Sequence, residues 1–132
     1  MTGENCNVLI VDDSALIRQL VKRTLSMAHV PVGQWFEAAD GQAALDVLRT
    51  NKVDLVLADL HMPTMGGIEM AQHIMADPAM RQIPVIVVSA DPNTERLDGL
   101  KRQGVRACLR KPFTPEDLRN VVREVLGGAD HA

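Results

Sequence analysis

The sequence is poor in aromatic residues: among 132 residues it has two Phe, one Trp and no Tyr. Single-stranded nucleic acid is usually held by stacking its bases on aromatic side chains, and this composition excludes such a platform. Basic residues are not in excess either, because 17 acidic residues outweigh 14 Lys and Arg and give a net charge of −3. An overall attraction to nucleic acid is therefore not expected, and nucleic acid is not predicted as a partner.

Long apolar segments are also missing. No run approaches the roughly 20 residues that cross a bilayer, and the N-terminus has no basic segment that leads into an apolar signal core. The two cysteines, Cys6 and Cys108, match no metal-binding or redox spacing and fit a reducing compartment. We therefore expect a cytoplasmic protein without a membrane partner.

Short β-rich runs recur along the chain, at residues 7–11, 34–38, 53–58, 84–88 and 105–109. The first, third and fourth runs are almost continuously apolar, which is typical of parallel strands covered on both faces. The second and fifth are mixed, and this favours the edges of a sheet. No internal repeat or low-complexity linker divides the chain, and its length leaves room for one domain.

Helical periodicity follows each run. The last helix has the clearest boundaries, with Thr114 as N-cap, Pro115 at the first helical position and Asp117 three residues after the cap. Three others are predicted at 43–48, at 68–75 and around Leu97 and Leu100. The first, which Ser14 could cap, places on one face Leu16, Ile17, Leu20, Val21, Thr24 and Leu25. Five alternating units predict an α/β fold, with a doubly wound parallel sheet and helices on both faces.

Polar residues follow the predicted strands: Asp12 and Asp13 the first, Asp59 the third, Ser89 the fourth and Lys111 the fifth. The carboxyl ends of parallel strands meet on one rim, which is where such sheets bind ligands. Three carboxylates gathered there repel one another unless a cation is present, and oxygen ligands favour Mg²⁺. A carboxylate beside such a cation can also attack phosphorus and form an aspartyl phosphate, while Ser89 and Lys111 hold phosphoryl oxygens.

At these residues the sequence resembles the receiver domain of bacterial response regulators, the phosphoacceptor half of two-component signalling. The resemblance covers residues 6–126, and its motifs are Val8-Leu9-Ile10-Val11-Asp12-Asp13-Ser14, Asp54-Leu55-Val56-Leu57-Ala58-Asp59-Leu60-His61-Met62-Pro63 with Gly66-Gly67, Val87-Val88-Ser89-Ala90 and Lys111-Pro112-Phe113. It implies a flavodoxin-like fold of five strands, in the order 2-1-3-4-5, and five helices. The receiver domain would span residues 7–127, between tails at 1–6 and 128–132.

The resemblance also implies the roles of the rim residues. Asp59 would accept a phosphoryl group from a histidine kinase or a histidine phosphotransfer protein, in a two-component pathway or a phosphorelay. Ser89 and Lys111 would hold the phosphoryl oxygens, and phosphorylation would switch binding to a downstream protein target without turning over a metabolite. The implied Mg²⁺ ligands are Asp13 directly, Asp12 largely through water, Asp59, and the backbone carbonyl of His61.

Further expectations follow from the same resemblance. His61, with a solvent-facing side chain, and Asp91 would set the rate of dephosphorylation, and the Lys111–Pro112 peptide would be cis. The phosphodonor would dock near Ile17, Leu20, Pro112 and Phe113.

Cys108 is a departure from the family pattern, because it occupies a position where many receivers carry Tyr or Phe. The aromatic switch of the family is therefore absent in its usual form. Alternation along the fifth strand places Arg106, Cys108 and Arg110 on one face, which in the family commonly meets targets. The two arginines suggest an acidic or phosphate-bearing partner, although a charged, solvated sheet edge gives the same pattern.

Three other functions compete with that of a phosphoacceptor. A haloacid dehalogenase type of phosphatase needs Asp-x-Asp after the first strand, whereas Asp12 and Asp13 are adjacent. A nucleotide or flavin binder is not favoured, because no Gly-rich loop follows the first strand and none of the few aromatic residues is placed to stack an isoalloxazine ring. A receiver-like interaction module that works without phosphorylation remains an open alternative.

Overall fold

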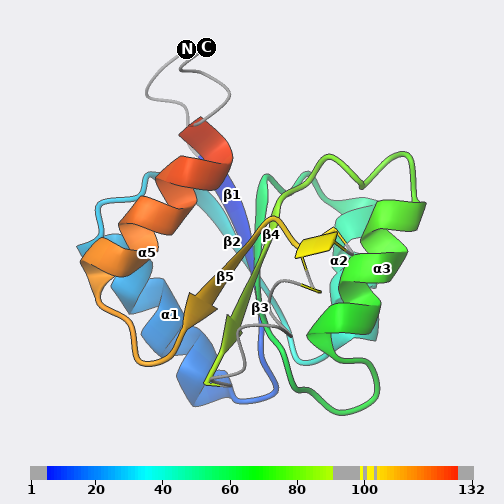
Figure 1. Cartoon of the computed structure of the whole chain (residues 1–132), viewed down its shortest axis with the longest axis horizontal. Helices are drawn as coiled ribbons and strands as arrows, with labels where there is room; N and C mark the ends of the chain where they lie inside the picture. Colours follow the sequence, from blue (N-terminus) through cyan, green and yellow to red (C-terminus); the bar gives the residue numbers. More distant parts are fainter. Residues whose placement is uncertain (1–5, 91–98, 100, 103, 128–132) are drawn as a thin grey trace.

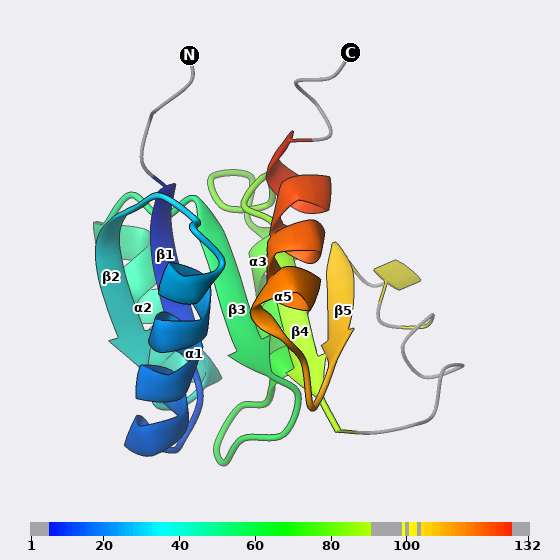
Figure 2. The same cartoon turned by 90° about the vertical axis from the view of Figure 1, so that its left-hand side faces the viewer.

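A computed structural model describes residues 6–90, 99, 101–102 and 104–127 of the chain. Its five strands form one parallel sheet in the order β2-β1-β3-β4-β5 (Figure 2). The strands are β1 Cys6–Val11, β2 Val32–Ala38, β3 Leu55–Asp59, β4 Val85–Ser89 and β5 Ala107–Arg110. The predicted strand order is confirmed, and so are the edge positions of the two mixed runs, which form β2 and β5.

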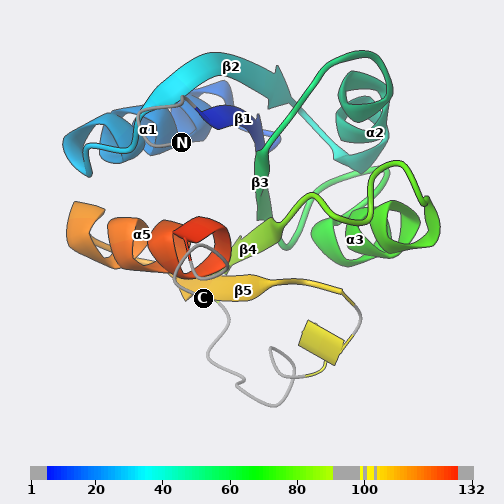
Figure 3. The same cartoon turned by 90° about the horizontal axis from the view of Figure 1, so that it is seen from above.

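Helices cover both faces of this sheet (Figures 1 and 3). On one face lie α1 (Ala15–Met27) and α5 (Pro115–Val122), which continues into a π-helical turn, η1 (Arg123–Gly127). On the other face lie α2 (Gly41–Thr50) and α3 (Gly67–Ala76). The fourth predicted helix, around Leu97 and Leu100, falls on residues outside the described ones. In the part that is described, no helix combines the length and the apolar character needed to cross a bilayer.

The core consists of two apolar layers, one on each side of the sheet. Successive side chains of a strand point to opposite faces, so Val8 and Ile10 of β1 pack beneath α1 and α5, whereas Leu9 and Val11 pack beneath α2 and α3. The inner strands β1, β3 and β4 supply both layers, and for this reason their sequences are apolar at almost every position. The fold therefore rests on aliphatic packing, as the scarcity of aromatic residues requires.

Side-chain caps fix the start of two helices that border the rim. The Ser14 hydroxyl accepts a hydrogen bond from the backbone N–H of Ile17 at 3.2 Å and starts α1 directly after β1. Thr114 and Asp117 form a reciprocal capping box at the start of α5, with two hydrogen bonds of 3.0 Å. Both predicted caps are confirmed, and each satisfies backbone N–H groups that a helix start leaves without partners.

The predicted apolar face of α1 is only partly a core face. Leu25 is fully buried, and Ile17 and Val21 are half-buried. Leu16 and Leu20 lie on the predicted side of the helix, but they are exposed. Helical periodicity reports that apolar residues share a side of the helix, and it does not distinguish the protein core from a surface that a partner could cover.

Candidate functional site

Three carboxylates meet where β1 and β3 end. These strands are neighbours and Val11 pairs with Ala58, so Asp12 and Asp13 emerge next to Asp59, the last residue of β3. One carboxylate oxygen from each aspartate lies within 4.8 Å of those of the other two. Asp12 is buried, Asp59 is half-buried and Asp13 is exposed. The predicted acidic cluster is present, and its oxygen donors fit a small hard cation such as Mg²⁺.

The environment of Asp12 disfavours its negative charge. Burial is the main reason that the pKa of Asp12 is raised, and the nearby charges of Asp59 and Asp13 raise it further. Two groups oppose this shift: the backbone N–H of Ser14, which donates to Oδ1 of Asp12 at 2.9 Å, and the more distant ammonium of Lys111. A divalent cation in the cluster would supply the positive charge that these protein groups only partly provide.

Lys111 and Ser89 lie at the same rim. The Nζ atom of Lys111 is 3.8 Å from Oδ1 of Asp59, and its backbone N–H donates to the carbonyl of Ser89 at 2.9 Å. Ser89 is buried at the end of β4, one residue beyond Val88, the register partner of Asp59. The Lys111–Pro112 peptide is cis, as the resemblance implies. The structure thus brings the predicted Ser and Lys to the acidic cluster.

The loop after Asp59 is held against the sheet by backbone contacts. The N–H of Leu60 donates to the carbonyl of Val88, and the N–H of Gly67 donates to the carbonyl of Leu60, both at 3.1 Å. A Cβ atom on Gly67 would lie 2.6 Å from the backbone oxygen of Asp59. Only glycine fits this close approach, so the start of α3 fixes the position of Asp59.

Of the two residues expected to set the rate of dephosphorylation, the structure describes only one. His61 has an exposed side chain in the loop two residues after Asp59, as predicted. Asp91 lies outside the described residues.

Arg18 of α1 contributes to the rim, and the sequence did not predict this. Its Nη1 donates to the backbone carbonyl of Asp12 at 2.6 Å, and its Nε donates to Glu37 of β2 at 2.7 Å. Lys22 binds the second carboxylate oxygen of Glu37. Hydrogen bonds from Lys22, and then from Arg18, lower the pKa of Glu37. This network ties the end of β1 to α1 and β2, and helical periodicity gives no signal for it because it joins polar residues 19 positions apart.

An apolar cavity of about 400 Å³ opens beside Lys111, between α1 and the start of α5. It is lined by Ile17, Leu20, Val21, Thr24, Ala90, Lys111, Pro112 and Phe113. The four residues that the resemblance assigns to phosphodonor docking therefore lie together around one depression that Lys111 borders.

The described face of β5 follows the predicted alternation. Arg106 and Arg110 are exposed and Cys108 is half-buried, whereas Ala107 and Leu109 are buried. No disulfide joins Cys6 and Cys108, which lie on strands that β3 and β4 separate.

Comparison with known proteins places this arrangement in a family. Residues 8–123 match the response regulator receiver domain. The chain is 32% identical to chemotaxis protein CheY-3 of Vibrio cholerae over 94% of each protein. It is 33% identical to the CheY homolog of Campylobacter jejuni, over 91% of this chain and 92% of that one. A solved structure of CheY4 from Vibrio cholerae superposes with a TM-score of 0.82 at 32% identity, covering 93% of this chain and all of that one. Together with the rim of acids, serine and lysine, these matches show that the chain belongs to the response regulator receiver domain family of two-component signalling.

Proposed function

We propose that Asp59 is the phosphoacceptor and that a phosphohistidine on a histidine kinase or a histidine phosphotransfer protein is the donor. The observation that carries this proposal is the position of Asp59. Its carboxylate lies within 4.8 Å of two further carboxylates, and the ammonium of Lys111 is 3.8 Å from it. A nucleophile that adjoins both a cation site and an ammonium group suits phosphoryl transfer, which depends mainly on positioning and charge neutralisation.

In the transfer step, a carboxylate oxygen of Asp59 attacks phosphorus while the bond from phosphorus to the donor imidazole nitrogen breaks. The electron pair of that bond returns to the imidazole ring, and the product is an aspartyl phosphate. Lys111 pairs with one phosphoryl oxygen as its charge grows, and Ser89 donates its hydroxyl hydrogen to another. Asp12, Asp13, Asp59 and the carbonyl of His61 would hold Mg²⁺, which would supply further positive charge to the phosphoryl oxygens when bound.

The aspartyl phosphate would switch the binding of a downstream protein and would then be lost by hydrolysis at the same site. His61 and Asp91 set the rate of that loss in this proposal. The chain turns over no metabolite and catalyses only its own phosphorylation and dephosphorylation. The cavity beside Lys111 is the proposed docking site for the phosphodonor, because its lining is mostly apolar and includes Lys111, whose ammonium is 3.8 Å from Asp59.

The proposal is tested by incubating the protein with phosphoramidate, a small donor with a P–N bond, and measuring intact mass. In Mg²⁺ we expect an adduct of about 80 Da, and chelation of Mg²⁺ or the substitution Asp59→Asn should abolish it. Asp46→Asn is the matched control, because Asp46 is an exposed acid on α2 that pairs with Arg49.

Two outcomes would contradict the proposal. An adduct that persists in Asp59→Asn would move the acceptor to another residue. A folded wild-type protein that never forms the adduct would favour the interaction module that works without phosphorylation.

A further inference from the structure

A cavity of about 520 Å³ lies at the end of the sheet opposite the acidic cluster. We call it the Arg119 cavity, and the described residues that line it are Cys6, Ala28, His29, Val30, Pro31, Arg119, Val122, Arg123 and Leu126. They come from the start of β1, from the turn between α1 and β2, and from α5 with η1, which Figure 2 shows together at the end of the sheet where β1 starts. From Cys6 to Asp12, β1 extends roughly 20 Å, so this cavity is remote from the acidic cluster.

The walls of the Arg119 cavity are held in place by backbone hydrogen bonds. The N–H groups of His29 and Val30 donate back to carbonyls of the last turn of α1, at 3.0 and 3.2 Å, so the helix ends in a Schellman turn. His29 takes the left-handed position of this turn, with a φ of 62°. The carbonyl of Pro31 accepts a hydrogen bond of 2.8 Å from the N–H of Cys6, which ties the turn to β1. The cavity is therefore preformed, as small-molecule sites usually are, and its volume lies in their range of roughly 300 to 1,000 Å³.

Positive charge in the Arg119 cavity lacks a counter-charge. Arg119 and Arg123 both line it, none of its described lining residues is an acid, and neither arginine forms an ion pair with a described residue. The Nε atom of Arg119 is buried and has no hydrogen-bond partner among the described residues. Asp54, whose charge reaches Cys6, does not line the cavity and accepts a hydrogen bond from the N–H of Asn7 at 2.8 Å. A buried N–H of a charged group without an acceptor is unfavourable, so the Arg119 guanidinium would gain from an anion.

The rest of the lining is mostly apolar, and it includes Val30, Pro31, Val122 and Leu126. Cys6 adds a thiol that stays protonated near neutral pH, because burial and then the charge of Asp54 raise its pKa to about 11. An uncharged, mostly apolar lining beside two unpaired arginines matches a ligand that has an apolar body and one acidic group.

We propose that the Arg119 cavity binds a small organic anion, with its apolar body among the apolar lining residues and its carboxylate, sulfonate or phosphate group paired with Arg119 and Arg123. Guanidinium groups suit this role, because they present several N–H donors in the plane of one charge. The inference stands whether or not Asp59 is the phosphoacceptor, because no residue of the acidic cluster lines the cavity.

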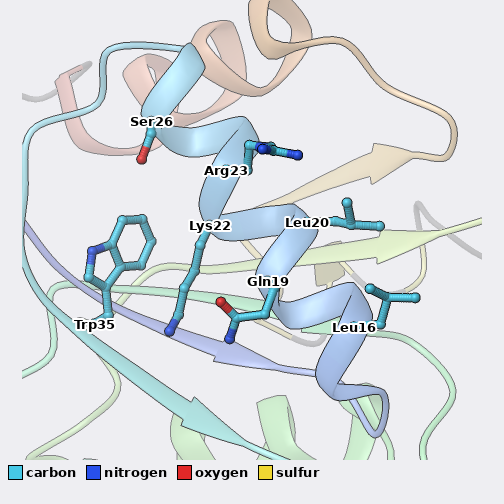
Figure 4. A pocket seen from close by; sticks show the side chains of 7 residues that line it. All are labelled: Leu16, Gln19, Leu20, Lys22, Arg23, Ser26 and Trp35. Atoms are coloured by element: carbon cyan, nitrogen blue, oxygen red, sulfur yellow. The ribbon is translucent and has the colours of Figure 1, made fainter.

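The Arg119 cavity shares no described residue with the other depressions that α1 and α5 border. The groove along α1 has Trp35 as its β2 wall (Figure 4). Phe113 lines the cavity beside Lys111, and Asn120 and Val121 line a depression beside β5. Substitutions at Arg119 and Arg123 therefore leave the lining of these three surfaces unchanged.

The probe is 1-anilinonaphthalene-8-sulfonate, an aromatic anion whose fluorescence rises in apolar surroundings. Its matched control is N-phenyl-1-naphthylamine, which keeps the aromatic body and lacks the sulfonate. We expect the sulfonate to bind saturably, with one molecule per chain, and the neutral compound to bind about tenfold more weakly because it cannot pair with the arginines. Backbone amide signals in nuclear magnetic resonance spectra should shift at Val30, Val122 and Leu126 and stay in place at Asp59.

Substitution of the arginines should weaken the sulfonate selectively. Arg119→Met should raise its dissociation constant about tenfold and leave that of the neutral compound unchanged, because a charge-assisted hydrogen bond is lost. Arg123→Met, at an exposed position, should act in the same direction, and it keeps the test available if Arg119→Met does not fold. Leu126→Ala should weaken both compounds, since it removes apolar contact.

Two further variants are controls and should bind both compounds as the wild type does. Arg106→Met removes an exposed arginine beside β5, outside the Arg119 cavity. Phe113→Ser alters the cavity beside Lys111. Because this dye also binds loosely packed states, well-dispersed amide signals are required of each variant.

Four results would overturn the inference. They are absence of binding by the sulfonate, equal affinity of the two compounds, a sulfonate affinity that neither arginine substitution lowers, and amide shifts that gather around Phe113 or Trp35 in place of Val30.

Discussion

The ammonium of Lys111 and the carboxylate of Asp59 face each other across the carboxyl end of β4, with 3.8 Å between Nζ and Oδ1. This separation is an ion-pair contact and is longer than a hydrogen bond. The two opposite charges therefore attract each other across the ends of β3 and β5. Because no hydrogen bond fixes the lysine to Asp59, its ammonium can move to pair with the oxygens of an incoming phosphoryl group.

Replacing Lys111 by Met should slow phosphorylation of Asp59 by a small phosphodonor about a hundredfold, because a preorganised charge that meets the phosphoryl oxygens is lost. Lys111→Arg keeps the charge in a different geometry. Its phosphorylation rate should therefore lie between those of the wild type and Lys111→Met. Rates from intact mass against time provide the comparison. A Lys111→Met protein that is phosphorylated at the wild-type rate would remove Lys111 from the site.

Asp12→Asn should stabilise the protein at pH 7 when divalent cations are chelated. The folded pKa of Asp12 is raised above its ordinary value of 3.8, so the folded state binds the proton more tightly than the unfolded state. Its contribution to stability is therefore greatest at low pH and is lost as pH rises through the folded pKa. Urea unfolding of both proteins at pH 3.5 and pH 7 tests this, and the stability advantage of Asp12→Asn over the wild type should grow with pH. Adding Mg²⁺ should make the wild type the more stable protein, because only the wild type keeps the full set of carboxylates.

Glu37→Gln should have the opposite pH dependence. The pKa of Glu37 is lowered from its ordinary value of 4.5 by Lys22 and then by Arg18. Its ion pairs therefore stabilise the fold above pH 4.5, and this stability is lost as pH falls through the folded pKa. We expect the substitution to cost about 1 kcal/mol at pH 7 and almost nothing at pH 3. Glu124→Gln, at an exposed position of η1, is the control. An equal loss of stability in both variants would show that the ion pairs of Glu37 are not the cause.

Cys6 should be a slow thiol in the folded protein. Burial, together with the charge of Asp54, raises its pKa from 9.0 to about 11. The thiolate fraction at pH 8 is then about a hundredfold smaller than in an unfolded chain, and alkylation depends on the thiolate. In a Cys108→Ser variant, iodoacetamide should modify Cys6 about a hundredfold more slowly without urea than with it. Similar rates in the two conditions would show that Cys6 is not buried.

Gly67→Ala should destabilise the fold and slow phosphorylation together. The added methyl group would lie 2.6 Å from the backbone oxygen of Asp59, so the loop or the acceptor must move. We expect a loss of about 1 to 3 kcal/mol, typical of overpacking. Gly99→Ala is the matched control, because a Cβ there meets nothing within 4 Å. Normal phosphorylation in a destabilised Gly67→Ala protein would show that the contact between Gly67 and the backbone of Asp59 does not position the acceptor.

Much of the site was predictable because it depends on where strands end. Asp12, Asp59 and Ser89 follow apolar runs that only a buried parallel strand explains, and parallel strands bring their carboxyl ends to one rim. The capping box of Thr114 and Asp117 was predictable for a similar reason, since it uses local spacing alone. The order of the strands needed the family resemblance, because the sequence pattern of each strand does not specify its neighbours.

Other features depend on contacts that local patterns do not encode. Arg18 and Glu37 meet because α1 packs beside β2, and nothing in their spacing indicates this. Leu16 and Leu20 have the periodicity of a core stripe, yet they are exposed. The π-helical turn from Arg123 to Gly127 is likewise not predicted, because the same apolar spacing serves an ordinary helix.

The burial of the three inner strands has a consequence for the dynamics of the protein. Residues 8–11, 55–58 and 85–88 are all buried, and their backbone amides belong to the centre of the ladder. Such amides exchange with deuterium only through the largest opening reactions of a protein. Asp12, Asp59 and Ser89 are attached directly to this slowly exchanging unit, whereas α1 and β2 lie at the periphery. Local opening at the edge can therefore accompany the arrival and departure of partners while the reacting groups keep their spacing.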